Sequence, residues 1–187
     1  MVKKVKSCVF ISGNGSNLRA ILRKSKQYNF PIKIELVISN NINAKGIKIA
    51  KNHSIPYKYL SSKKMKDFEK KSLFEIQKKK IKFLCLAGFM KVLSKNFIKN
   101  FKHKIINIHP SLLPKYKGLD VHRRILENKE KFSGCTVHFV NAKLDSGKII
   151  SQKKIVIKKN ETEESLKKKN LLLQHKLYPE SIISIFR

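Results

Sequence analysis

The chain has 187 residues, of which 43 are Lys or Arg and 12 are Asp or Glu, so its formal net charge is +31 at pH 7. This length suits one domain with a substantial hydrophobic core, and we expect a single domain over residues 1–187. The apolar runs are too short for a transmembrane helix, and the N-terminus lacks the apolar region and cleavage site of a signal peptide. We therefore expect a cytoplasmic protein without a membrane partner.

Strand-like and helix-like segments alternate along the chain. The expected strands cover residues 5–12, 34–39, 57–60, 82–87, 104–108, 134–140 and 148–157. The expected helices cover residues 17–26, 44–53, 64–79 and 121–128, with a helical turn near Asn96 and a last helix, opened by a capping-box pattern, over 162–185. This alternation predicts an α/β fold, an open, mostly parallel, Rossmann-like sheet with helices on both faces and a site at the carboxyl ends of the strands.

A glycine-rich turn, Ser12-Gly13-Asn14-Gly15-Ser16-Asn17, follows the first strand and leads into the first helix. Its glycines allow a tight turn, and the free N–H groups at the start of a helix favour a bound anion, so we expect a phosphate here. A dinucleotide site is disfavoured, because Leu18 stands where the third glycine is needed and the second strand lacks the acidic ribose ligand. On these residues alone, a purely structural turn remains open.

The segment around Asn107 and His109 has the residue types of a reaction centre. Alternation places both on one face at the carboxyl end of an expected strand. An amide can donate to a developing oxyanion, and an imidazole can exchange a proton near neutral pH. Asp145, in a turn further along the chain, is a candidate partner. A structural histidine and an ordinary turn aspartate are the alternatives.

The cysteines and histidines show no metal-binding pattern. The three cysteines, Cys8, Cys85 and Cys135, lie far apart, and we expect buried free thiols. The histidines lack HxxxH and HExxH spacing, and no Cys/His set recurs at zinc-finger intervals. We therefore expect no metal.

The large positive charge is typical of proteins that bind polyanions. The lysines, however, are spread over nearly every segment, and Lys, Ile and Asn, whose codons are A/T-rich, are all abundant. No RNP motif, zinc finger or helix-turn-helix pattern is present in the sequence. We expect a basic surface that attracts anionic metabolites and no specific nucleic-acid partner.

Four blocks in order resemble the phosphoribosylglycinamide formyltransferase family over nearly the whole chain. The blocks are ISGNGSNL at 11–18, LAGFMKVLS at 86–94, NIHPSLLPKYKG at 107–118 and VHFVNAKLDSG at 137–147. The resemblance implies transfer of the formyl group of 10-formyltetrahydrofolate, a cosubstrate, to the amine of glycinamide ribonucleotide on the way to IMP. It also implies small-molecule partners, a monomer or weak homodimer, and a cis peptide between Leu113 and Pro114.

The resemblance also assigns roles to residues. It implies a catalytic trio of Asn107, His109 and Asp145. It places the ribonucleotide phosphate at Gly15, Ser16 and Asn17, and the folate at Met90, Lys91, Val92, Leu93 and Asn107. In this interpretation Asp145 raises the pKa of His109 above its ordinary value of about 6.5, so that a protonated imidazole stabilises the oxyanion.

Two positions depart from the family pattern. Met65 stands where the family has a folate-contacting Arg, and Gln174 replaces a substrate-contacting Glu, which puts ligand affinity rather than the chemistry in question. Two related activities are rivals. Formyltetrahydrofolate deformylases typically carry an N-terminal regulatory domain, and methionyl-tRNA formyltransferases carry a C-terminal RNA-binding domain. We expect neither domain here.

Overall fold

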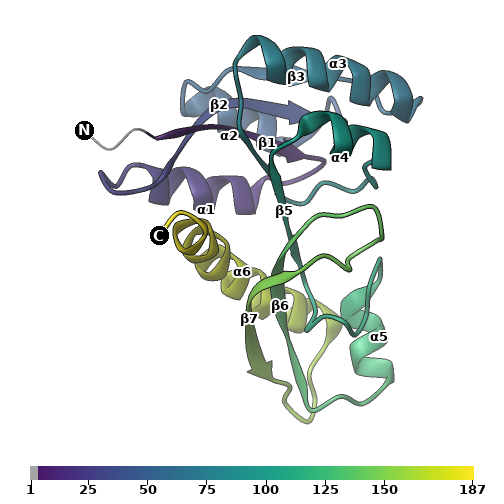
Figure 1. Ribbon diagram of the computed structural model, residues 1–187. Helices are drawn as coiled ribbons and strands as arrows, with labels where there is room; N and C mark the ends of the chain where they lie inside the picture. Colours follow the sequence, from purple (N-terminus) through teal and green to yellow (C-terminus); the bar gives the residue numbers. More distant parts are fainter. Residues whose placement is uncertain (1–3) are drawn as a thin grey trace.

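The computed structural model describes residues 4–187, which form an open seven-stranded sheet with helices on both faces (Figure 1). The strands are β1 (Val5–Ile11), β2 (Ile32–Ser39), β3 (Tyr57–Tyr59), β4 (Phe83–Leu86), β5 (Lys104–His109), β6 (Phe132–Phe139) and β7 (Ile149–Val156). The helices are α1 (Ser16–Ser25), α2 (Lys45–Asn52), α3 (Met65–Lys78), α4 (Lys95–Phe101), α5 (Val121–Glu127) and α6 (Glu163–Ile185). These elements confirm the ones expected from the sequence.

The sheet has the strand order β3-β2-β1-β4-β5-β6-β7. Neighbouring strands from β3 to β5 are parallel, whereas β6 pairs antiparallel with both β5 and β7. The expected mostly parallel α/β sheet is therefore confirmed, with an antiparallel hairpin at one edge. The chain builds outward from β1 to β3 and then returns to β4 on the other side of β1. Such a reversal opens a crevice at the carboxyl ends of the strands, where open α/β sheets bind their ligands.

The core lies on both faces of the sheet because β1, in its middle, alternates its side chains between them. Val9 and Ile11 pack in the cluster that contains side chains of α1, α2 and α6, whereas Cys8 and Phe10 pack in the cluster with α3 and α4. The Phe10 ring meets the Phe68 ring of α3 edge-on, with 5.6 Å between centroids. A strand segment covered on both faces has no solvent side, which explains the unbroken apolar run from Cys8 to Ile11 in β1.

Helix α6 is tied to the centre of the sheet through Tyr178. This fully buried side chain directs its hydroxyl at the carbonyl oxygens of Leu86 and Ile106, at 2.9 and 3.2 Å. Both carbonyls lie near the carboxyl ends of β4 and β5. The helix is thereby fixed to the two strands that lead into the polar loops at the carboxyl end of the sheet.

Two local predictions from the sequence are also confirmed. Cys8, Cys85 and Cys135 are buried free thiols. The peptide bond between Leu113 and Pro114 is cis.

Candidate active site

The loops at the carboxyl ends of β1 and β4 contact each other across the crevice. The Ser12 N–H donates to the Gly88 carbonyl at 3.1 Å, and the Met90 N–H donates to the Ser12 hydroxyl at 2.8 Å. The end of β4 lies beside β5, where Leu86 pairs with Asn107. The three segments expected to bind phosphate, bind folate and carry out the chemistry are therefore neighbours at the carboxyl end of the sheet.

Asn107, His109 and Asp145 come together at the end of β5. Asn107 and His109 project from the same face of that strand, and Asp145 reaches them from the loop between β6 and β7. The Asp145 carboxylate lies 3.3 Å from His109 Nδ1 through Oδ2 and 3.5 Å from Asn107 Nδ2 through Oδ1. The Gly118 N–H donates to Oδ2 at 3.0 Å and so fixes the carboxylate.

The Asp145 carboxyl is ionised at neutral pH. Burial raises its pKa, but contacts with His138, the Gly118 N–H and His109 outweigh burial and hold the pKa below its ordinary value. A carboxylate in this position can favour a positive charge on the neighbouring imidazole.

The buried His109 ring has a hydrogen-bond acceptor at each nitrogen. Nε2 lies 2.8 Å from the Tyr116 carbonyl oxygen, and Nδ1 faces Asp145. Burial lowers the pKa of His109, while the Tyr116 carbonyl and Asp145 act in the opposite direction without offsetting it. The expectation of a raised pKa is therefore wrong for the free protein, because it counted the charge of Asp145 and left out burial. Since Nε2 donates to a carbonyl, neutral His109 carries its proton on Nε2 and presents the Nδ1 lone pair.

His138 is a fourth member of the cluster that the sequence did not single out. It lies on β6 directly opposite Asn107 and is 2% exposed. Its Nδ1 donates to the Phe139 carbonyl at 2.9 Å, and its Nε2 lies 3.3 Å from Asn107 Nδ2 and 3.6 Å from Asp145 Oδ1. The contacts of Asn107 Nδ2 with His138 and Asp145 are both long for hydrogen bonds, so this donor can shift to a stronger acceptor such as an oxyanion.

The glycine-rich turn has the geometry expected of an anion site. Gly15 adopts the left-handed conformation, with φ of 69°, directly before α1, and none of the described side chains caps this helix. A Cβ atom on Gly15 would lie 2.5 Å from the Gly46 Cα, so only glycine fits. Ser16 and Asn17 occupy the first turn, where the N–H groups of a helix lack intrahelical partners.

Gln174 lies beside this turn, on α6. Asn17 Nδ2 donates to Gln174 Oε1 at 2.9 Å, and Gln174 Nε2 lies 3.3 Å from Asn170 Oδ1. Asn17 Oδ1 is buried and has no hydrogen-bond partner within residues 4–187. An orphaned acceptor next to an uncapped helix start indicates a place where a polar ligand group is expected to dock.

The segment expected to hold the folate is mostly exposed. Met90 and Val92 are 65% and 59% exposed, which is high for apolar side chains, and Lys91 is exposed as well. Such a patch beside a polar crevice suits a ligand with an apolar body. Leu93, by contrast, packs in the core with α3 and α4, so its side chain stabilises the fold and only its backbone can face a ligand. Met65 also packs against that core cluster, at the start of α3.

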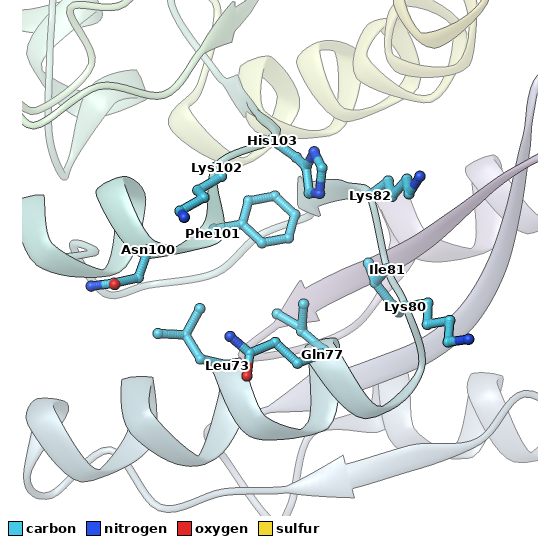
Figure 2. A pocket seen from close by; sticks show the side chains of 10 residues that line it. Leu73, Gln77, Lys80, Ile81, Lys82, Asn100, Phe101, Lys102 and His103 are labelled. Atoms are coloured by element: carbon cyan, nitrogen blue, oxygen red, sulfur yellow. The ribbon is translucent and has the colours of Figure 1, made fainter.

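Neither of two surface hollows contains the residues of the trio. A hollow of about 310 Å³ lies at the amino ends of β4 and β5, between α3 and α4, and is rimmed by Lys80, Lys82, Lys102 and His103 (Figure 2). A second, of about 330 Å³, lies between the loop that follows β5 and the start of β6, and is lined by Tyr116 and Glu130 among others. Over residues 4–187, no group of three His, Cys, Asp or Glu side chains is placed to bind a metal ion. No described helix is long and apolar enough to cross a membrane.

Comparison with known proteins places this chain in a known family. The formyl transferase family model matches residues 5–182. The trifunctional purine biosynthetic protein adenosine-3 of Homo sapiens is 37% identical over 183 residues, which cover 96% of this chain and 18% of that protein. The corresponding protein of Drosophila melanogaster is 38% identical over 189 residues, covering 96% of this chain and 14% of the relative. The chain thus spans less than a fifth of the length of these curated relatives.

Two solved structures match over all or nearly all of their length. The crystal structure of phosphoribosylglycinamide formyltransferase from Campylobacter jejuni has a TM-score of 0.93 and 36% identity, with 100% of both chains covered. The enzyme of the same name from Brucella melitensis has a TM-score of 0.93 and 34% identity, with 98% of this chain and 96% of that chain covered. On the sequence match and the shared fold, the chain belongs to the formyl transferase family.

Proposed function

We propose that this protein transfers the formyl group of 10-formyltetrahydrofolate to the amine of glycinamide ribonucleotide, a step of purine biosynthesis that leads to IMP. The observation that carries the proposal is the contact among Asn107, His109 and Asp145 at the end of β5, beside an uncapped, glycine-led helix start. Support also comes from the family and from the two formyltransferase structures that align end to end.

The reaction begins when the amine of the ribonucleotide attacks the formyl carbon. The carbonyl oxygen then takes on negative charge, which the Asn107 amide stabilises as a hydrogen-bond donor, joined by His109 once its Nδ1 has gained a proton. Because burial keeps His109 largely neutral in the free protein, its Nδ1 is able to accept a proton as the amine adds. The imidazolium formed in this way is stabilised by the Asp145 carboxylate at 3.3 Å.

Collapse of the tetrahedral intermediate completes the transfer. The bond from the formyl carbon to the folate nitrogen breaks, and the proton taken from the amine passes from His109, directly or through water, to that nitrogen. The products are the formylated ribonucleotide and tetrahydrofolate. No covalent intermediate with the protein is required.

The remaining residues bind the two substrates. Gly15, Ser16 and Asn17 hold the ribonucleotide phosphate through the N–H groups at the start of α1, and the positive surface attracts both anionic substrates. Met90, Lys91, Val92 and the backbone of Leu93 line the folate site, which Asn107 closes at its inner end. Gln174 supplies an amide in place of the family's carboxylate.

A single assay tests the activity. The purified protein is mixed with 10-formyltetrahydrofolate, and release of tetrahydrofolate is followed with glycinamide ribonucleotide, with water as the only acceptor, and with methionyl-tRNA. The proposal expects release only with the ribonucleotide. Release of formate without an amine would instead identify a deformylase, and turnover with the tRNA would identify the other rival.

We also propose a cytoplasmic enzyme with small-molecule partners and no specific nucleic-acid ligand, present as a monomer or weak homodimer. The lysines responsible for the charge lie on most elements rather than on one stripe. Sedimentation over a range of protein concentrations tests the oligomeric state. A salt-sensitive gel shift tighter than micromolar would argue against the absence of a nucleic-acid partner.

A further inference from the structure

The Tyr116 carbonyl oxygen is a hydrogen-bond acceptor for Nε2 of His109. It lies 2.8 Å from Nε2, closer than Asp145 lies to Nδ1. Tyr116 has φ of 56°, a left-handed conformation that residues with a side chain adopt only when their surroundings hold them there. The position of this carbonyl therefore depends on whatever anchors the Tyr116 side chain.

Glu130 is that anchor. It lies in the connection between α5 and β6, outside the four sequence blocks that carry the family resemblance. Its Oε1 accepts a hydrogen bond from the Tyr116 hydroxyl at 2.9 Å and another from Lys115 Nζ at 2.8 Å. One carboxylate oxygen thus holds two successive side chains of the loop.

Arg124 of α5 lies over one face of the Tyr116 ring. The guanidinium lies 5.4 Å from the ring centroid and donates to the Lys117 and Leu119 carbonyls at 2.7 and 3.2 Å. Arg124 fixes the backbone after Tyr116, whereas Glu130 fixes the side chain of Tyr116 itself. The hollow of about 330 Å³ lined by Tyr116 and Glu130 leaves room for the ring to move once the carboxylate contact is lost.

We propose that Glu130 is a positioning residue for the reaction, and that by holding the Tyr116 side chain it keeps the Tyr116 carbonyl on His109 Nε2. The inference rests on the proposed role of His109. With the carbonyl in place, the proton of neutral His109 stays on Nε2 and Nδ1 is free to act as the base. Without the carbonyl, the ring loses the contact that keeps its proton on Nε2. This contact is also one of the two that favour the protonated form of His109.

The titration of His109 is the direct readout of this arrangement. The charged and titratable groups around the ring are Asp145 and His138 from the side of β6 and β7, and Arg124 and His122 from α5. The Tyr116 carbonyl raises the pKa of His109 against the larger effect of burial. Displacement of the carbonyl should therefore shift the titration of His109 to more acidic pH.

The test follows the His109 ring signals by NMR against pH in the wild type and in four variants of the full chain. A fifth variant, His109→Ala, serves to assign these signals. Tyr116→Phe removes one oxygen and no charge. Glu130→Ala removes the acceptor and the charge, whereas Glu130→Gln removes the charge and keeps an oxygen that can accept. Glu127→Ala, at an exposed residue of α5 that pairs with Arg123, is the matched control for loss of a negative charge.

Tyr116→Phe and Glu130→Ala are expected to shift the His109 midpoint to lower pH and to lower kcat several-fold, with KM nearly unchanged. Glu130→Gln should keep a His109 midpoint and a kcat close to those of the wild type, and Glu127→Ala should match the wild type in both. A lower melting temperature of Tyr116→Phe with an unchanged His109 midpoint would show a merely structural role and overturn the proposal. The His109 midpoint measured by NMR does not depend on turnover, so it tests the positioning by Glu130 separately from catalysis. Full activity of His109→Ala would show instead that the proposed catalytic role of His109 is wrong.

Discussion

Replacement of Asp145 by Asn tests the electrostatic part of the proposed mechanism. The substitution removes the negative charge beside His109 and keeps the shape of the side chain. An amide oxygen can still accept from the Gly118 N–H, which lies 3.0 Å from the carboxylate. The loop between β6 and β7 is therefore expected to keep its conformation, and the change isolates the effect of charge.

The size of the effect follows from the geometry of the pair. Two unit charges 3.3 Å apart attract by about 5 kcal/mol at an effective dielectric constant of about 20. Removing the charge also removes the cost of burying it, so the net effect is smaller than this attraction. We therefore expect the transition state to lose about 1.5–3 kcal/mol of stabilisation, the usual value of a hydrogen bond to a charged group. Since about 1.4 kcal/mol corresponds to a factor of ten in rate, kcat should fall roughly 10- to 150-fold.

The assay measures kcat and KM against pH for the wild type and Asp145→Asn. Burial lowers the pKa of His109 and Asp145 raises it, so removal of the Asp145 charge should lower this pKa further. The limb of the kcat–pH profile that reports His109 should therefore move to more acidic pH. Both KM values should change little, because the phosphate turn and the folate segment lie outside the trio. Asp67→Asn, at an exposed position on α3, is the charge-matched control. Wild-type turnover with an unshifted limb in Asp145→Asn would refute the reasoning.

Three further results are expected. His109→Ala and Asn107→Ala should each lower kcat by roughly 10²–10³, the usual loss of one oxyanion donor, while circular dichroism stays native; near-normal turnover in both would remove the catalytic assignment. Gly15→Ala should lose about 1–3 kcal/mol of stability and raise KM for the ribonucleotide, because its Cβ would meet the backbone of α2 at 2.5 Å, whereas Gly13→Ala, with nothing within 4 Å, should behave as the wild type in urea melts and kinetics. Burial lowers the pKa of three histidines, His109, His122 and His175. Below about pH 6.5 the unfolded chain binds protons that the folded chain does not, so the free energy of unfolding should fall as the pH is lowered from about 7.5 to about 5.5. Equal free energies of unfolding from urea melts at these two pH values would contradict this account.

The fold could be predicted from the sequence because its signals are local. The apolar run of β1 and the helical spacing of Leu18, Ile21 and Leu22 directly reflect the surfaces that they bury. The positions of Asn107 and His109 also followed from local alternation on one strand. These predictions required no knowledge of how distant segments meet.

The parts that were missed depend on contacts between distant segments. His138 lies opposite Asn107 only because of the register between β5 and β6, and no spacing along the chain encodes that register. Leu93 was assigned to the folate site together with residues 90–92, and the sequence did not show that its side chain, unlike those of the three exposed residues before it, packs in the core with α3 and α4. The pKa of His109 needed the burial of the ring, which the sequence does not give.

Helix α6 contacts both the turn proposed to bind phosphate and the strands beside the proposed folate site. Gln174, which contacts the phosphate turn, and Tyr178, which anchors the ends of β4 and β5, are four residues apart and so lie on one side of the helix. The acceptor and donor molecules must meet with their reacting atoms about 3–3.5 Å apart, and a misplacement of 1 Å can cost roughly a hundredfold in rate. Because α6 contacts both regions, a shift of this helix would misalign the two substrates even with every catalytic side chain intact.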